Sequence, residues 1–544
     1  MAVSKRAVLP IALVGVSVLL GGWFLQEGVS REENVYVQVR LFQEVVDHVA
    51  EQFVEDVDRD ALYDSAIEGV LRDLDDPNSS FIRASDYEDF RIRATEGDYG
   101  GVGLEVLERE GFVTVMNTIP GGPGARAGIR AGDRFVAIEG EDAEGWPVDR
   151  AVDLLRGAPG TEIEVQMARP GIEDPIPFVL RREVIQLKSV PFSTLLDDDV
   201  GYVPLQVFRT TSSEEVREAV ASLVDQGARG VILDLRNNPG GLLDEGIGVS
   251  DLFLDAGDAI VETRGRAAGQ SEAYAARSGA VFPDLPLVIM VDETSASASE
   301  IVAGALQDHD RALVVGAPSY GKGSVQSLFR LSGGNVLRLT TALWYTPVGR
   351  SIQKDLDREE DELPHGALAL DGSLVATDDP VDRPEFTSLA GRTLLGGGGI
   401  TPDVWVVQDT LTTAEASAVR ALYQQAGLFI RTVFNVAVAY IQESEPSADF
   451  AVDDALVARF REALADAGLE IDPGILDAAD RYIRYQLESE IALQAFGEDG
   501  EFTRLMDRDL QLQAALEALA QASSWEGLVA EGSQPTRRAV PVGG

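Results

Sequence analysis

Apolar residues recur along this chain at two different spacings, and the two spacings indicate different elements. Over residues 34–95 and again over residues 411–525, apolar side chains return every three or four positions, which predicts helices with one apolar face. Between these regions lie short, uninterrupted apolar runs, such as residues 230–236 and 286–291, which are typical of buried strands. Helical patterns separate these runs. The chain is therefore predicted to be an α/β protein with helical segments at both ends.

One stretch, residues 286–326, combines an apolar strand, a helix, a second strand and a turn. The first strand leads into a run of small hydroxyl residues, which are Thr294, Ser295, Ser297 and Ser299. A helix with the acidic Glu300 in its first turn follows, and residues 311–315 form the second predicted strand. That strand leads to a Gly-Lys-Gly turn around Lys322. Serines are thus predicted at the start of a helix, and a lysine on a turn after the next strand.

These serines and this lysine are the residue types that nucleophilic catalysis needs. Backbone N–H groups at a helix start are unpaired and can bind an oxyanion. A lysine in an apolar, glycine-lined site can accept a proton from a serine, because burial disfavours its charged form. The chain has only four lysines, and its other basic residues apart from histidine are arginines, which cannot act as bases. Lys322 is therefore the candidate base, while spacing alone does not choose among Ser295, Ser297 and Ser299.

Three other interpretations of this stretch compete with catalysis. Residues 316–322 fit the G-x-x-x-x-G-K of a phosphate-binding loop, but Gly323 stands where a magnesium-binding Ser or Thr is needed. Residues 319–322 fit the S-x-x-K of penicillin-recognising enzymes, but Pro318 and Gly321 disfavour the helical turn that this motif needs. In the third interpretation a serine caps a core helix and the lysine is solvated. The pattern alone leaves that structural interpretation open.

Composition narrows the classes of function. The formal net charge of −46, from 91 acidic and 45 basic residues, disfavours nucleic acid as a partner because phosphate would be repelled. The absence of cysteine excludes disulfides, thiolate metal sites and cysteine nucleophiles. The histidines are only His48, His309 and His365, which leaves little room for a histidine-based triad, and His309 is predicted to lie at the surface. The composition also leaves little room for a metal site.

Residues 7–25 form an uncharged apolar run that is long enough to span a bilayer. Lys5 and Arg6 precede the run, and this positive flank is expected to stay inside, so the rest of the chain faces outward. A cleaved signal peptide is the alternative, but the run is long for such a segment and has no clear A-x-A cleavage site. We expect a membrane-anchored protein with its body in the periplasm or at the cell exterior, or a secreted protein if the segment is cleaved.

The glycine-rich sequence at residues 99–106 resembles the carboxylate-binding loop of a PDZ domain. Glycines there let consecutive backbone N–H groups turn toward an anionic chain end. The resemblance implies a β-rich PDZ domain over residues 96–183 that binds the apolar C-terminus of a protein or peptide. The residues that it assigns to peptide binding are Gly101, Val102, Gly103 and Leu104.

The stretch around the serines and the lysine resembles the carboxy-terminal processing proteases, the tail-specific serine endopeptidases of peptidase family S41. The matching segments are Ser295-Ala296-Ser297-Ala298-Ser299-Glu300, Gln307-Asp308, Arg311-Ala312 and Gly321-Lys322-Gly323 with Val325-Gln326. By position, the resemblance makes Ser297 the nucleophile, Lys322 the general base and Gln326 the residue that orients the lysine. It thereby chooses one of the three candidate serines.

A second matching segment is Leu235-Arg236-Asn237-Asn238-Pro239-Gly240-Gly241. The resemblance implies that a backbone N–H group of Gly240 or Gly241 joins that of Ala298 in an oxyanion hole. Without the resemblance, the Gly-Gly turn is equally well explained as the start of a helix with no catalytic role. Two further matching segments, residues 344–352 and 399–403, lie close together in most relatives. Here a polar, acidic insert at about residues 355–395 separates them, and we expect it to be a disordered surface loop.

The resemblances imply an overall organisation for the chain. After the anchor come a helical segment (residues 34–95), the PDZ domain, a catalytic domain with a crotonase-like (ClpP/crotonase) α/β core (186–410), a helical region (411–525) and a flexible tail (526–544). The implied function is cleavage of proteins at or near their C-terminal tails, and the resemblance implies neither a metal nor another cofactor. The helical regions are candidates for contacts in a homo-oligomer. An inactive PDZ scaffold and a crotonase-like acyl-transfer enzyme are the alternatives; the catalytic residues disfavour the first, and the outward location disfavours the second.

Overall fold

The computed structural model describes residues 35–92, 97–109, 111–169, 172, 174–354, 367–375, 383–469, 471–522, 524–531 and 536–538. The predicted membrane segment lies outside the described residues, as do about half of the predicted tail and two parts of the predicted insert, 355–366 and 376–382. The described part of the tail forms the end of α15 (Trp525–Glu531) and the strand β24 (Thr536–Arg538), so it is not the flexible segment that was predicted. Among the described residues, no helix is long and apolar enough to span a membrane. The chain divides into two compact units, Met1–Ala84 with Gln326–Thr340, and Ser85–Val325 with Thr341–Gly544.

The smaller unit holds most of the predicted N-terminal helical segment. A helix over residues 35–52 is followed by α2 (Arg59–Arg72), which begins where the carboxylate of Asp58 accepts a hydrogen bond from the Asp60 N–H at 3.0 Å. A short strand, β1 (Ser80–Ile82), pairs with the start of β18 (Val336–Tyr345), so this segment is not helical throughout. Apolar residues of the first helix are exposed, among them Val35, Val39 and Phe42.

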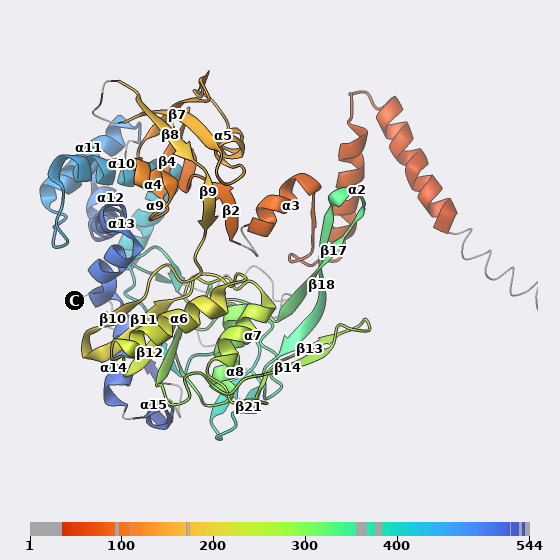
Figure 1. The fold of residues 1–544 in the computed structure, drawn as a ribbon, viewed down its shortest axis with the longest axis vertical. Coiled ribbons are helices and arrows are strands. Elements are labelled where there is room, and N and C mark those ends of the chain that lie inside the picture. Colours follow the sequence, from red (N-terminus) through yellow and green to blue (C-terminus); the bar gives the residue numbers. More distant parts are fainter. Residues whose placement is uncertain are drawn as a thin grey trace, which may run out of the picture. The chain divides into compact units, whose positions relative to one another are not determined.

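The predicted peptide-binding domain is built on a six-stranded antiparallel sheet (Figure 1). Its strands are β3 (Leu104–Arg109), β4 (Phe112–Thr118), β5 (Arg134–Ile138), β6 (Glu141–Asp142), β7 (Glu162–Ala168) and β8 (Ile176–Arg181). Strand β3 lies at the edge of the sheet because, in the described part of the chain, it pairs with β4 alone, and helix α5 (Val148–Leu155) packs beside it. Strands β2 (Asp98–Gly101) and β9 (Glu183–Gln186) come from the start and the end of the domain's sequence and pair with each other as a separate two-stranded ribbon.

The catalytic region is organised around a seven-stranded sheet in the described chain. Its strands, in spatial order, are β10 (Thr194–Leu196), β11 (Val200–Pro204), β12 (Gly230–Asp234), β15 (Leu287–Val291), β16 (Leu313–Gly316), β23 (Val404–Val406) and β24 (Thr536–Arg538). All pairs are parallel except β10 with β11. The parallel strands place their carboxyl ends at one edge, where the loops that follow β12 and β15 meet.

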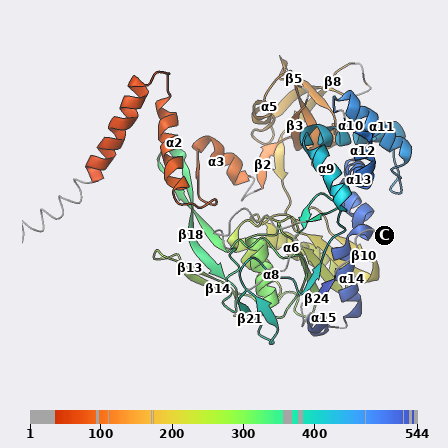
Figure 2. The same ribbon diagram turned by 180° about the vertical axis from the view of Figure 1, so that it is seen from behind.

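Both faces of this sheet are buried, which explains why its strands read as uninterrupted apolar runs. In β12, Val231 and Leu233 belong to one hydrophobic cluster, and Ile232, between them, belongs to another. The first cluster includes residues of α6 (Ser212–Asp225), α7 (Leu243–Asp251) and α8 (Ala298–Asp308), which cover one face (Figure 1). The second includes residues of α14 (Leu510–Gln521), which covers the other face (Figure 2).

The predicted C-terminal helical region consists of helices that surround their own hydrophobic core. They are α9 (Thr413–Tyr423), α10 (Ala426–Ser444), α11 (Asp454–Asp466), α12 (Pro473–Ala478) and α13 (Asp480–Leu505), before α14 and α15 (Trp525–Glu531). Helix α10 contacts the β3–β8 domain, where the guanidinium of Arg109 lies 4.1 Å from the ring centre of Phe434. Helix α14 packs against the catalytic sheet. The region is therefore integrated with both neighbouring domains.

The described part of the acidic insert is ordered, contrary to the expectation of a surface loop. It forms two short hairpins, β19 (Ala367–Leu368) with β20 (Leu374–Val375), and β21 (Glu385–Thr387) with β22 (Thr393–Leu395). The reason is a buried ion pair network beneath α8. Arg392, which is 8% exposed, contacts Asp310 and Asp403, the latter at 2.8 Å, and donates to the carbonyl of Gln307 at 2.9 Å. Burying this arginine requires those carboxylates and the ordered hairpin that carries it.

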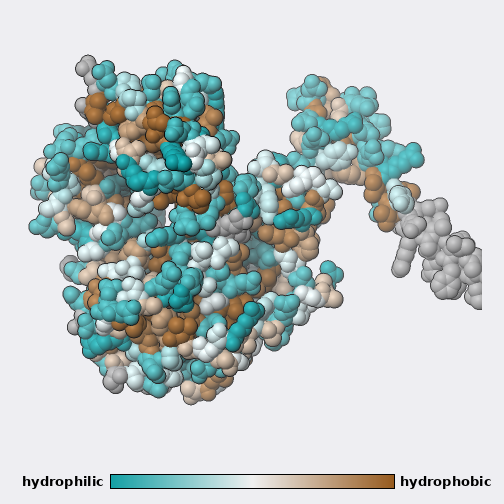
Figure 3. All heavy atoms as spheres, viewed as in Figure 1, coloured by the Kyte–Doolittle hydropathy of each residue, from teal (hydrophilic) through white to brown (hydrophobic). Residues whose placement is uncertain are grey.

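The surface agrees with the acidic composition. Hydrophilic residues are spread over much of the face shown in Figure 3, with hydrophobic residues scattered between them. Charged side chains without a partner are costly to bury, so a chain with 91 acidic and 45 basic residues keeps most of its excess carboxylates in water.

Candidate active site

Ser297 lies at a strained turn between β15 and α8. It is the residue before the first turn of α8, and its φ of 55° and ψ of −111° are unusual for a residue with a side chain. Such strain costs about 1–3 kcal/mol and is typical of functional sites, where surrounding structure enforces it. Ser297 is partly exposed, whereas its neighbours Ala296 and Ala298 are buried. The turn therefore presents one serine at the surface of an otherwise buried segment.

The other two candidate serines are structural. Ser295 and Ser299 are both fully buried. The Ser295 hydroxyl donates to the carbonyl of Leu235 at 2.8 Å, and the Ser299 hydroxyl donates to the carbonyl of Asn238 at 2.9 Å. Geometry thus separates three serines that spacing alone could not, and leaves Ser297 as the accessible hydroxyl.

A single buried carboxylate joins the serine turn to the lysine turn. Oε2 of Glu300 accepts a hydrogen bond from the backbone N–H of Ser297 at 2.8 Å and from that of Lys322 at 2.9 Å. Its Oε1 accepts from the hydroxyl of Ser319 and from the N–H of Gly321, both at 2.6 Å. Four donors on one carboxylate hold the two turns in a fixed relation, and the two candidate catalytic residues share the same oxygen.

The environment of Glu300 also changes its acidity. Burial raises the pKa of Glu300 to about 7, although the hydrogen bonds from Ser319, Gly321, Lys322 and Ser297 act to lower it. The four donors can all be satisfied only by the ionised form, because a protonated carboxyl becomes a donor itself. The junction between the two turns is therefore expected to loosen as the pH falls below about 7.

The backbone of Lys322 is fixed on both sides, and the lysine is partly buried. Its carbonyl accepts a hydrogen bond from Nε1 of the buried Trp344 at 3.1 Å, while its N–H is bound to Glu300. Gly321 has a φ of 91°, and a Cβ there would lie 3.0 Å from the amide nitrogen of Gly399, so this position requires glycine. Residues 317–323 form no helix, so the helical turn that S-x-x-K requires is absent from them.

Gln326 lies in β17 (Ser324–Arg330), at the start of the segment that belongs to the smaller unit. Its side-chain Nε2 donates to the hydroxyl of Thr340 at 3.3 Å within that unit. Ser297 and Lys322 belong to the larger unit. The orienting action of Gln326 on Lys322 stays a prediction.

The loop after β12 lies directly against Ser297. A Cβ on Gly240 would be 2.8 Å from the Cβ of Ser297 and 2.9 Å from the nitrogen of Ala298, and the φ of Gly240 is 93°. Only glycine permits this approach. The Gly240 N–H donates to Oδ1 of Asn238 at 2.9 Å, and its carbonyl accepts from the N–H of Phe208 at 2.9 Å. The structure thus brings the predicted glycine turn to the serine and the helix start, with the N–H of Gly240 already engaged.

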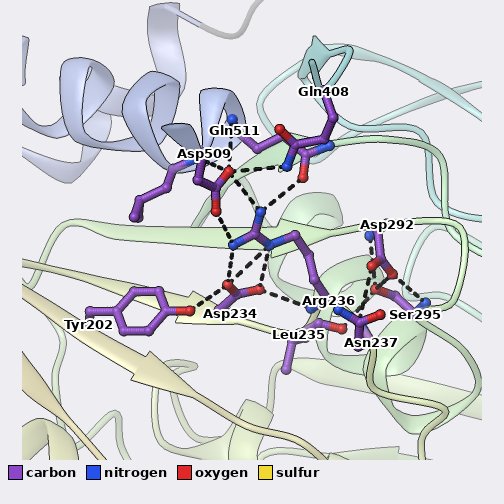
Figure 4. Close-up of polar contacts among 11 residues, drawn as sticks. Tyr202, Asp234, Leu235, Arg236, Asn237, Asp292, Ser295, Gln408, Asp509 and Gln511 are labelled. Atoms are coloured by element: carbon purple, nitrogen blue, oxygen red, sulfur yellow. Dashed lines mark hydrogen bonds and ion pairs between the residues drawn. The ribbon is translucent and has the colours of Figure 1, made fainter. Parts of the chain in front are cut away.

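Hydrogen bonds join this loop, residues 235–241, to the serine turn (Figure 4). We name it the oxyanion loop after its predicted role. The N–H of Asn237 donates to Oδ2 of Asp292 at 3.0 Å, and Oδ1 of the same carboxylate accepts from the N–H of Ser295 at 2.9 Å. The carbonyl of Asn238 accepts from the N–H of Ala296 at 3.0 Å. The serine turn and the oxyanion loop therefore form one hydrogen-bonded substructure.

Sequence reasoning assigned no role to Glu300 and Asn238 beyond their places in matching segments. Glu300 was expected only as an acidic first-turn residue of α8. One signal would have pointed to more: the helix around it is apolar, and a glutamate on such a helix must find donors when it is buried. Nothing in the sequence indicates which donors those are.

His309 is not the surface residue that was predicted. Its side chain is 9% exposed, and a ring nitrogen lies 2.7 Å from the carbonyl of Ala259. It follows the last residue of α8, whereas Ser297 precedes the first, so the length of the helix, about 15 Å, separates them. His309 therefore cannot take the proton of Ser297.

The predicted peptide-binding residues run from Gly101, the last residue of β2, to Leu104, the first residue of β3. Val102 is 2% exposed, and its carbonyl accepts from the N–H of Gly124 at 2.9 Å, so it belongs to the core of the domain. Leu104 is partly buried and begins the edge strand β3. Gly103 has a φ of 68°, the left-handed conformation that glycine adopts without strain. The loop therefore leads directly to a free strand edge.

Comparison with known proteins agrees with this geometry. Models of three families match the chain: peptidase family S41 over residues 199–360, the PDZ domain over 114–169, and the N-terminal domain of the activating protease CtpB over 25–85. A carboxy-terminal-processing protease of Bartonella bacilliformis is 39% identical over 328 residues, which is 60% of this chain and 74% of that protein. The chain belongs to peptidase family S41. It is a carboxy-terminal processing protease, and thus a serine-type peptidase with a PDZ domain.

Other carboxy-terminal processing proteases are also similar to this chain. The carboxy-terminal processing protease CtpA of Bacillus subtilis is 30% identical over 346 residues, covering 64% of this chain and 72% of that protein. Among solved structures, a photosystem II D1 C-terminal processing protease is 31% identical, with 56% of this chain and 82% of that chain covered and a TM-score of 0.34.

Proposed function

We propose that this S41 peptidase is an endopeptidase that uses Ser297 as nucleophile and Lys322 as general base. The observation that carries the proposal is the shared oxygen of Glu300, which accepts from the backbone N–H groups of both residues. Nucleophile and base must be held in one geometry for the proton to pass between them. A carboxylate that binds both turns at once supplies that constraint.

In the proposed reaction, neutral Lys322 takes the proton of the Ser297 hydroxyl as the oxygen attacks the scissile carbonyl carbon. The oxyanion that forms is bound by the N–H of Ala298, which has no partner within α8 because Ala298 is the first residue of that helix, and by the N–H of Gly241. Gly241 is preferred over Gly240 because the Gly240 N–H donates to Asn238. Protonated Lys322 then returns the proton to the leaving amine, and water hydrolyses the acyl-enzyme.

The proposed core is crotonase-like. Its support is a mainly parallel sheet with helices on both faces, in which the loops after β12 and β15 lie against each other at Gly240 and Ser297. The acyl-transfer alternative would share that arrangement, but the accessible Ser297 on a strained turn favours a covalent serine mechanism.

Covalent labelling tests the nucleophile. A serine-reactive phosphonate should label the wild-type protein, and peptide mass spectrometry should locate the adduct on Ser297. An inactive scaffold or an acyl-transfer enzyme without a serine nucleophile would remain unlabelled at this residue. Ser295→Ala and Ser299→Ala proteins that remain folded should still be labelled, because their hydroxyls are buried and bound to carbonyl groups.

We also propose that the PDZ domain selects substrates by an apolar C-terminal tail. A peptide that pairs with the edge strand β3 would lie beside α5, and its terminal carboxylate would meet the loop before Leu104. The N–H groups of Gly103 and Leu104 are the donors closest to the start of that edge. The partly buried Leu104 offers an apolar contact to the last side chain.

Amidation of a peptide's C-terminus tests this recognition. An amidated peptide should bind more weakly than the free acid by roughly 1.5–3 kcal/mol, the contribution of a hydrogen bond to a charged group. Fluorescence anisotropy with the Ser297→Ala protein measures this affinity without cleavage. Equal affinities for the two peptides would contradict the assignment.

We further propose that the N-terminal run at residues 7–25 anchors the protein with its body outside the cytoplasm. The support is the length of the run and the Lys5-Arg6 flank before it. The protein should be released from membranes only by detergent or by cutting after about residue 30. N-terminal sequencing of the mature protein should find the run intact, and a new N-terminus at residues 26–31 would exclude an anchor.

A further inference from the structure

The side chain of Arg236 connects the oxyanion loop to the C-terminal helical region. Arg236 follows β12 in that loop, and only 13% of its side chain is exposed. Its guanidinium makes two parallel hydrogen bonds to Asp509, from Nη1 to Oδ1 at 3.0 Å and from Nη2 to Oδ2 at 2.7 Å. On the other side it contacts Asp234, with Nη2 2.7 Å from Oδ2. Figure 4 shows Arg236 between these two carboxylates.

Asp509 is itself held in place by the start of α14. Its Oδ1 accepts hydrogen bonds from the N–H groups of Gln511 at 3.1 Å and Leu512 at 3.0 Å, which makes it the cap of that helix. Nε2 of Gln408 donates to the same oxygen at 3.1 Å. The carboxylate that meets Arg236 therefore has a fixed position, set by a helix packed on the catalytic sheet.

The cluster holds the guanidinium of Arg236 between the carboxylates of Asp234 and Asp509, so its formal charge is −1 when all three groups are ionised. Burial acts against the charge of Arg236, but Asp234 and Asp509 hold its pKa above the usual range. Burial likewise opposes the charge of Asp509, but Arg236 and the other donors keep its pKa below the usual value. Tyr202 adds a hydrogen bond to Asp234 at 2.7 Å. A neutral side chain at position 509 would leave buried Arg236 with one carboxylate in place of two.

The orientation of Arg236 bears on the oxyanion loop because its backbone is part of that loop. Oδ1 of Asp234 accepts from the Arg236 N–H at 3.0 Å, so the same cluster holds both its side chain and its main chain. The next residue, Asn237, has a φ of 58° and gives its N–H to Asp292. Gly240 and Gly241 follow three and four residues further on. A shift of Arg236 is therefore transmitted directly to the loop beside Ser297.

We propose that Asp509 is a positioning residue for catalysis, through which α14 holds the oxyanion loop by way of Arg236. The C-terminal helical region is then part of the catalytic unit. The inference rests on the proposed function for its effect on the reaction, but its structural half, the order of the loop, can be measured without any activity.

The test compares the full-length Asp509→Asn protein with an Asp453→Asn control. Asparagine caps helices as well as aspartate does, so α14 keeps its cap in the first variant while Arg236 loses a charged partner. Asp453 caps α11 in the same region, accepting from the Leu456 N–H at 2.9 Å, and has no contact with Arg236 among the described residues. The two variants therefore make the same chemical change at a helix cap, with and without the link to the loop.

Two measurements are made on both variants. Amide hydrogen exchange of residues 237–241 should become at least about tenfold faster in Asp509→Asn, because protection depends on local opening, and should not change in Asp453→Asn. The kcat for a peptide substrate should fall by roughly 10- to 100-fold with KM little changed, because a misplacement of about 1 Å costs up to about 100-fold in rate. Circular dichroism confirms that both variants are folded.

The outcomes separate the two proposals. Unchanged exchange of the loop in Asp509→Asn, or an equal change in Asp453→Asn, overturns the positioning role. Faster exchange with an unchanged kcat overturns it as well, because the loop would then not need Asp509 for the reaction. A third outcome is that Asp509→Asn speeds up exchange of the loop while the wild-type protein neither cleaves peptide nor takes the phosphonate label. That outcome would support the link from Asp509 to the loop and would contradict only the proposed function.

Discussion

Purified Lys322→Arg protein will fold and will not cleave peptide. Arginine keeps the positive charge and most of the bulk of lysine, but it does not lose its proton in proteins and cannot accept one from Ser297. The fall in the rate of peptide cleavage should equal that of Ser297→Ala, roughly 10⁴-fold or more. Nucleophile and base act together, so removing either one removes the effect of both. The measurement is cleavage of a peptide substrate, with folding checked by circular dichroism.

Lys188→Arg is the matched control, since Lys188 is exposed and lies on a connecting segment between β9 and β10. It should retain wild-type activity. The activity of the wild type should rise with pH as Lys322 loses its proton, without a contribution from histidine. A folded Lys322→Arg protein that cleaves at a rate near that of the wild type would show that Lys322 is not the base.

The Glu300→Gln protein should lose most of its activity although both catalytic side chains remain. An amide has one acceptor oxygen in place of two, so at least one pair of the donors Ser297, Lys322, Ser319 and Gly321 meets an NH₂ group. The turns then separate, and we expect kcat to fall by roughly 100-fold, the effect of a misplacement of about 1 Å. Steady-state kinetics on the folded variant measure this fall.

The same substitution should change how stability depends on pH. The pKa of Glu300 is about 7 in the folded protein, against 4.5 for an ordinary glutamate. The folded state therefore binds the proton more tightly, and the contribution of this group to stability is fully present at low pH and is lost as the pH rises through about 7. Between about pH 5 and pH 8 the free energy of unfolding of the wild type should fall by about 2 kcal/mol more than that of Glu300→Gln.

Glu215→Gln is the control for both measurements. Oε2 of Glu215 accepts from the N–H groups of Ser189 and Val190, and Oε1 accepts from a threonine hydroxyl, so it is a similar carboxylate outside the site. Its substitution should leave kcat nearly unchanged. Full activity in Glu300→Gln, or an equal loss in Glu215→Gln, would show that Glu300 does not fix the two turns.

Much of the fold could be predicted from the sequence because burial leaves a direct pattern. Strands buried on both faces gave uninterrupted apolar runs, and the runs at residues 230–236 and 286–291 correspond to β12 and β15. The strand β1 and the ordered hairpins of the insert could not be predicted in this way. They are short, and they depend on partners far away in the chain, such as Asp310 and Asp403 for Arg392.

In the candidate site, too, some residues could be predicted from the sequence and others could not. Residue types and a resemblance to known proteases were enough to single out Ser297 and Lys322, because catalysis needs particular functional groups at particular turns. The groups that position them could not be derived, because hydrogen bonds such as those of Glu300 and Asp509 join residues across the folded chain. The same limit applies to Ser295 and Ser299, whose structural role became evident only from the carbonyls that they contact.

The place of α14 and β24 in the catalytic sheet has a consequence for the order of synthesis. The ribosome makes Ser297 and Lys322 long before it makes these two elements, and until then the sheet lacks the strand that pairs with β23. During that interval Arg236 also has no Asp509 to bind. On the proposed role of Asp509, a nascent chain therefore has Ser297 and Lys322 before it has the helix that positions the loop beside them, and full activity is expected only after α14 has packed on the sheet.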